Sequence, residues 1–156
     1  MTDLWPKEFN YTQVKAPVTI LKEQAALLGQ KTKNLLEAKV LLHTDTGLAN
    51  VATGIADQIF GDGKSKSFHY AFYFVAPTLN NYRYRFFTMS YDIQLYPVFF
   101  DVDEDLQLEI VNGDTKKAVI ANSEEELIEI LRKIFNADKT MRILQSILAQ
   151  IEFEPG

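Results

Sequence analysis

The sequence predicts a single α+β domain, in which an antiparallel meander sheet of five to six strands has an N-terminal helix and two C-terminal helices packed on one face. Three observations support this prediction. Apolar residues recur at helical spacing near both ends of the chain and alternate at strand spacing between them. Thirteen of the 18 Phe and Tyr residues fall between positions 67 and 100, enough aromatic surface to cover one face of a sheet. A length of 156 residues suits one domain, which we place at 16–152 behind an extended arm of residues 1–15.

The first predicted element is a helix that begins near Pro17, because proline suits the first helical turn. Apolar residues then recur every three or four positions, and we expect the helix to end within 29–34. Residues 34–47 change to an alternating pattern, which predicts a strand. Residues 48–60 fit both a helix and a strand, and a glycine within them weakens both patterns. The composition of residues 61–67 predicts a loop.

The central segment, FHYAFYFVAPTLNNYRYRFF (68–87), predicts two strands around a short turn. If Ala76 pairs with Tyr82, Phe74 lies opposite Tyr84 and Phe72 lies opposite Phe86, so one side is nearly all aromatic. A slip of one residue would mix the two sides, and this contrast favours the register. The other side then carries a mixed set of apolar and cationic residues, which comprises His69, Tyr73, Val75, Arg83, Arg85 and Phe87.

The next segment predicts three further strands. Residues 93–100 alternate so that Ile93, Leu95 and Phe99 continue the aromatic side, and a proline at position 97 indicates a bulge or an edge. After a charged connection, residues 106–111 and 116–121 flank Asn-Gly-Asp, a sequence typical of a hairpin turn.

The C-terminal third predicts two helices. Ser123 and Glu126 have the spacing of a capping box, and an apolar stripe at i, i+3, i+4, i+7, i+8 follows them. Asp138 is expected to cap the last helix, whose apolar stripe continues to Ile151.

Composition excludes several classes of protein. Cysteine is absent, which excludes disulfides, thiolate metal sites and a cysteine nucleophile. The N-terminus does not resemble a signal peptide, and no apolar run approaches 18 residues, so we expect a cytoplasmic protein that does not enter a membrane. A net charge of −5 disfavours nucleic-acid binding, which depends on clustered Lys and Arg.

No motif for catalysis, a cofactor or a metal is complete. GDGKS (61–65) lacks the first glycine of a phosphate-binding loop. Asp101, Asp103 and Asp105 have the spacing of the first calcium ligands in a helix–loop–helix site, but the required Gly and Glu are missing. Neither of the two histidines has a partner at metal-ligand spacing, and no nucleophile motif surrounds a serine. We therefore expect a protein that is not an enzyme and has no catalytic residues, cofactor or metal.

The mixed side of the sheet is the candidate functional surface. It is too apolar for a face that meets only water, so we expect it to be partner- or ligand-facing through His69, Tyr73, Arg83, Arg85 and Phe87. The leading hypothesis is a non-catalytic protein-interaction module, which acts as an adaptor, a chaperone-like protein or a homodimer through the open face of the sheet. The alternative is a small-molecule binding protein, with a pocket between sheet and helices where one of the two arginines meets an anionic ligand.

The order helix, meander sheet, helices resembles that of small acidic bacterial adaptors such as secretion chaperones and their sensory-regulator relatives. The resemblance implies a protein partner. It lies in the order of the elements alone, so no functional residue is carried over from those proteins.

Overall fold

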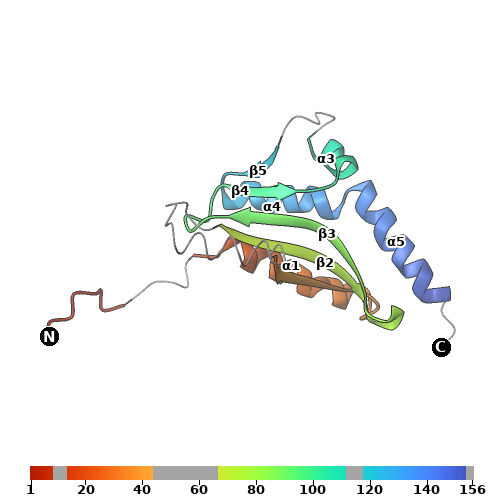
Figure 1. The fold of residues 1–156 in the computed structure, drawn as a ribbon, viewed down its shortest axis with the longest axis horizontal. Coiled ribbons are helices and arrows are strands. Elements are labelled where there is room, and N and C mark those ends of the chain that lie inside the picture. The colour runs from red at the N-terminus through yellow and green to blue at the C-terminus, as the bar shows by residue number, and fades with distance from the viewer. Residues whose placement is uncertain (9–13, 44–66, 112–117, 154–156) are drawn as a thin grey trace, which may run out of the picture.

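The computed structural model describes residues 1–8, 14–43, 67–111 and 118–153. It has two layers, a twisted sheet and a layer of helices against it (Figure 1). The five strands are antiparallel and follow the order β1-β2-β3-β4-β5. The elements are α1 (Pro17–Lys31), β1 (Glu37–Leu42), β2 (Phe68–Ala76), the short 3-10 turn η2 (Pro77–Leu79), β3 (Tyr82–Tyr91), β4 (Val98–Asp101), α3 (Glu104–Ile110), β5 (Val119–Ala121), α4 (Glu124–Phe135) and α5 (Asp138–Phe153). The predicted α+β class, the meander sheet, the N-terminal helix and the two C-terminal helices are confirmed.

The two strands at the centre of the sheet keep the predicted register near their turn and depart from it further on. Val75 pairs with Arg83, and Phe74 pairs with Tyr84. A β-bulge then shifts the register, so that Phe72 pairs with Phe87 and not with Phe86. The expected position of Phe87 on the open face is therefore wrong.

The bulge brings two consecutive phenylalanines into the core. Phe86 packs on Phe74 with ring centroids 4.8 Å apart, and Phe87 stacks on Phe72 at 5.2 Å. Both side chains are buried. The extra residue lets one strand supply two adjacent rings to the same side, which strict alternation forbids.

The strand predicted over 93–100 is shorter and begins later. Asp92 starts a turn, because its side chain accepts a hydrogen bond from the Gln94 N–H and its carbonyl accepts one from the Leu95 N–H. Leu95 has a φ of 75°, which breaks the extended backbone. Ile93 is consequently exposed, and β4 turns Phe99 away from α1, α4 and α5 while its neighbours Val98 and Phe100 are buried. The prediction that Ile93 and Phe99 continue the aromatic side is therefore wrong.

The strand predicted over 106–111 is the helix α3. The Asp103 carboxylate accepts a hydrogen bond from the Leu106 N–H at 2.8 Å and so caps the helix, and two acidic residues follow in the first turn. Leu106 and Ile110, one turn apart, are the buried residues of this helix. The predicted turn at 112–114 and the segments 48–60 and 61–66 lie outside the described residues.

The C-terminal helices begin at charged or hydroxyl groups. The Ser123 hydroxyl accepts from the Glu126 N–H, as the predicted capping box requires. The Glu126 carboxylate accepts from the N–H of Asn122, the residue before the cap, where a capping box would use the N–H of Ser123. The cap of α5 differs from the prediction, since Asp138 is the first residue of the helix. Glu109 of α3 caps it instead, because its carboxylate accepts hydrogen bonds from the Asp138 and Lys139 N–H groups at 2.8 and 3.1 Å.

The core lies between the aromatic face of the sheet and the helices α1, α4 and α5, which all cover that face (Figure 1). Among the described residues, no helix combines the length and the apolar character needed to cross a membrane.

Candidate functional site

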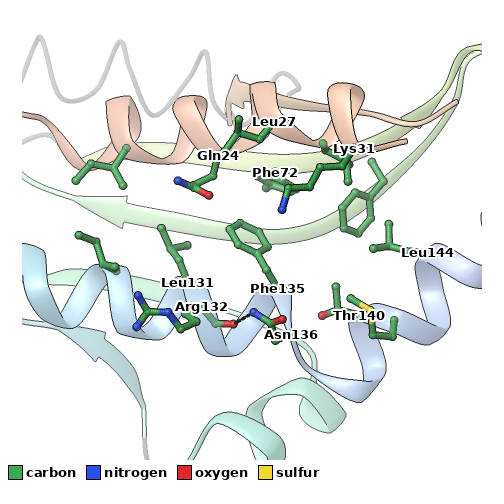
Figure 2. A pocket seen from close by; sticks show the side chains of 15 residues that line it. Gln24, Leu27, Lys31, Phe72, Leu131, Arg132, Phe135, Asn136, Thr140 and Leu144 are labelled. Carbon is green, nitrogen blue, oxygen red and sulfur yellow. Dashed lines mark hydrogen bonds between the residues drawn. The ribbon is translucent and has the colours of Figure 1, made fainter. Parts of the chain in front are cut away.

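A cavity of about 500 Å³ opens between α1 on one side and α4 and α5 on the other, above the aromatic face of β2 (Figure 2). We call it the interhelix cavity. Its mouth is partly apolar, since Leu27, Ile128 and Met141 are each about two-fifths exposed. It is lined by Ile20, Gln24, Leu27, Leu28, Lys31, Phe72, Phe74, Ile128, Leu131, Arg132, Phe135, Asn136, Thr140, Met141 and Leu144.

The two long walls of the interhelix cavity have the same spacing in the sequence. The lining residues of α1 are 20, 24, 27, 28 and 31, and those of α4 and its C-cap residue are 128, 131, 132, 135 and 136. Positions three and four apart share one face of a helix, so each helix presents a continuous stripe to the space between them. Residues 140, 141 and 144 of α5 extend the second wall.

The floor of the cavity is aromatic. Phe72 meets Phe74 edge-on with centroids 5.6 Å apart, and Phe135 from α4 packs on Phe72 at 5.5 Å. These rings belong to the cluster that contains Phe86 and Phe87, so the floor is held by the core of the protein. A rigid apolar floor is typical of a preformed binding site.

Three of the polar side chains that line the cavity are bound within the protein. The Thr140 hydroxyl donates to the Ile134 carbonyl, and the Asn136 amide donates to the Arg132 carbonyl at 2.9 Å. The Arg132 guanidinium donates to both carboxylate oxygens of Glu129 at 2.6 and 2.8 Å. No Asp or Glu belongs to the described lining.

The sequence-predicted site residues lie elsewhere. His69, Tyr73, Arg83 and Arg85 share the face of the sheet that is turned away from α1, α4 and α5, whereas Phe87 lies in the core. The Arg83 guanidinium carbon lies 4.7 Å from the centroid of the Tyr73 ring, a cation–π contact. The structure therefore brings three of the five predicted residues together, since Tyr73 also pairs with Arg85 across the two strands.

Arg85 lines a second cavity, of about 410 Å³, beside the end of β4. Its lining also includes His43, Asp101 and Asp103, so a cation and two carboxylates share a polar hollow. Neither arginine reaches the interhelix cavity, where the ligand-binding alternative expected one of them. Among the residues that the structure describes, no group of three or more His, Cys, Asp and Glu is placed to hold a metal ion.

Two phenols that lie outside the interhelix cavity have raised pKa values. Burial raises the pKa of Tyr91 to about 12, and a hydrogen bond from the Val18 N–H opposes part of that effect. Burial also raises the pKa of Tyr96, with a further contribution from the Glu124 carboxylate at the start of α4. Both phenols stay neutral near neutral pH.

Comparison of the chain with protein-family models, with curated proteins and with solved structures finds no match. The candidate site therefore stands on its geometry and chemistry.

The interhelix cavity was missed by the sequence prediction, because its existence depends on how far apart two helices pack. One signal was present. Gln24 and Lys31 lie on the same face of α1 as the apolar residues of the cavity, where an amphipathic helix normally has apolar residues alone.

Proposed function

We propose that this protein is a non-catalytic binding protein, which holds an apolar ligand in the interhelix cavity between α1 and α4–α5. The observation that carries the proposal is the cavity itself, about 500 Å³ with an aromatic floor and apolar walls. Cavities of about 300–1,000 Å³ with mostly apolar linings and a few polar groups are typical of small-molecule sites. A cytoplasmic location, which the cysteine-free sequence favours, is part of the same proposal.

The lining supports binding without chemistry. Its described residues include no His, Asp, Glu, Ser or Cys, and the one hydroxyl, that of Thr140, donates to a backbone carbonyl. Acid–base and nucleophilic catalysis need such groups, or a lysine with one of them as its partner, within hydrogen-bond reach of one another, and Lys31 has no such partner in the described lining. The polar groups of the described lining thus fit recognition of a ligand and not its conversion.

The test uses N-phenyl-1-naphthylamine, a neutral apolar dye whose fluorescence rises when it leaves water. The wild-type protein is expected to bind it, and Ile128→Asp, which places a charge at the mouth of the cavity, is expected to weaken binding by about tenfold. Ile93→Asp is the matched control, since Ile93 is exposed on the turn before β4 and does not line the cavity.

Equal dye affinities of Ile128→Asp and Ile93→Asp would contradict the proposal, as would a wild-type protein that binds no dye. Far-ultraviolet circular dichroism confirms that each variant is folded. Because both residues are exposed, neither substitution removes a contact of the core.

A second candidate function is protein binding through the open face of the sheet, as an adaptor or as a homodimer. The observation that favours it is the exposure of Phe99 and Leu41 on the same face as the Tyr73–Arg83 pair, which α1, α4 and α5 leave uncovered. Light scattering tests self-association. If the wild-type protein is a dimer and the double variant Tyr73→Glu, Phe99→Glu is a monomer, the result supports the homodimer. A wild-type protein that is a strict monomer would refute the homodimer.

A further inference from the structure

The polar groups of the interhelix cavity are not equivalent. Arg132, Asn136 and Thr140 are hydrogen-bonded to protein partners. Among the described residues, the Gln24 amide and the Lys31 ammonium make no hydrogen bond or ion pair, and both belong to α1. These two groups are therefore the ones that a ligand can engage without breaking a bond within the protein.

Their spacing describes the shape of a ligand. Gln24 and Lys31 are seven residues apart, which is nearly two helical turns and about 10 Å along the axis. Leu27 and Leu28 lie between them, and Phe135 faces them from α4. Figure 2 shows the Lys31 side chain reaching from the end of α1 across the cavity toward Phe135, with Gln24 further along the same helix. An apolar body of about this length fits between the two polar groups.

The charged groups that line the cavity favour one sign of charge on the ligand. Lys31 has no carboxylate near it in the described lining, whereas Arg132 is neutralised by Glu129. A cation in the last turn of a helix complements the helix dipole, which accounts for a lysine at this position. The dipole does not account for a side chain that extends over an apolar floor. An anionic group at this end of the cavity would complement the lysine.

We infer that the interhelix cavity takes a small amphiphilic monocarboxylate, with its carboxylate at Lys31 and its apolar chain over Phe72 and Phe135 toward Gln24. The inference rests on the proposed function and adds the chemical class of the ligand. The apolar chain supplies most of the affinity through burial, and the lysine supplies the preference for an anion.

The test is displacement of N-phenyl-1-naphthylamine by decanoate, by decan-1-ol and by decyltrimethylammonium, each below its micelle concentration. Decanoate is expected to bind about fivefold more tightly than decan-1-ol, the size of effect that an exposed ion pair gives. Affinity is expected to rise about fourfold for each added methylene from octanoate to decanoate, since each buries more apolar surface.

Variants of α1 test the contribution of Lys31 to the affinity for an anion. Lys31→Gln is expected to remove the fivefold advantage of decanoate and to leave decan-1-ol unchanged, and Lys31→Arg is expected to retain the advantage. Lys22→Gln is the matched control, because Lys22 is an exposed lysine of α1 that does not line the cavity. Lys31 is itself exposed, so none of these variants is expected to unfold the protein.

Equal affinities for decanoate and decan-1-ol, or a preference for the ammonium, would overturn the inference. Equal decanoate affinities of Lys31→Gln and Lys22→Gln would overturn it too, as would displacement by an acidic amphipathic peptide but not by decanoate. In each of these cases dye binding in the cavity would still stand, so the proposed function survives. Absence of dye binding in the wild-type protein refutes the proposed function and the inference together.

Discussion

The phenol of Tyr91 joins the sheet to the start of α1. Tyr91 ends β3, and its oxygen accepts a hydrogen bond from the Val18 N–H at 3.4 Å. The N-cap residue of this helix, Ala16, has no side chain that can accept such a bond, so the phenol satisfies one of the N–H groups that a helix start leaves unpaired. Because α1 forms one wall of the interhelix cavity, this contact also helps to position the cavity.

The acidity of Tyr91 makes stability depend on pH. Its pKa in the folded protein is about 12, against an ordinary value of 10.0. The raised pKa means that the folded state holds the proton more tightly, so the contribution to stability is complete below pH 10 and is lost as the pH rises through 12. A difference of two pKa units means that ionisation of Tyr91 lowers the free energy of unfolding by up to about 2.7 kcal/mol.

Urea unfolding at several pH values tests this for Tyr91→Phe. At pH 7 the variant is expected to be less stable by about 1 kcal/mol, because the bond to Val18 is lost. Between pH 10 and pH 12 the wild type is expected to lose stability that the variant keeps, so the difference narrows and then reverses. Tyr82→Phe, at an exposed tyrosine, is the control. Parallel curves for the wild type and Tyr91→Phe would contradict the argument.

At the scale of elements, α3 directs the last helix. Both carboxylate oxygens of Glu109 accept hydrogen bonds from the first N–H groups of α5. An acidic group at a helix start also complements the dipole of that helix. The direction in which α5 leaves α4 decides where Met141 and Leu144 stand on the wall of the interhelix cavity.

Glu109→Ala is expected to lower the free energy of unfolding by about 1–2 kcal/mol, the usual cost of a lost cap. Amide hydrogen exchange is expected to accelerate at Asp138 and Lys139 while the amides of α1 keep their protection. Glu8→Ala is the control, as it removes the same charge from the N-terminal arm, outside every helix. If both variants unfold at the same urea concentration as the wild type, Glu109 does not act as a cap.

At the scale of the whole molecule, the sequence predicted the elements whose signals are local. The helices α1 and α4 have apolar stripes and, in α4, a capping box, and these fall within a few turns of chain. The register of β2 and β3 near their turn follows from the contrast between aromatic and mixed sides, which one slip would destroy.

The predictions that were wrong depend on competition between patterns or on tertiary contacts. Leu106 and Ile110 fit both a strand and a helix, and the Asp103 cap decides for the helix. The bulge that turns Phe87 inward is stabilised by rings on other elements, such as Phe72 and Phe135, which no local pattern reveals. The interhelix cavity depends in the same way on the separation of two helices that are far apart in the sequence.

The central claim is that ligands bind between α1 and α4–α5. Methyl NMR of the protein labelled at Ile, Leu and Met, titrated with decanoate, tests it most directly. We expect shifts and intermolecular nuclear Overhauser effects at Leu27, Ile128 and Leu144, which line the interhelix cavity. Effects confined to Leu41 and Ile120, on the open face of the sheet, would contradict the claim.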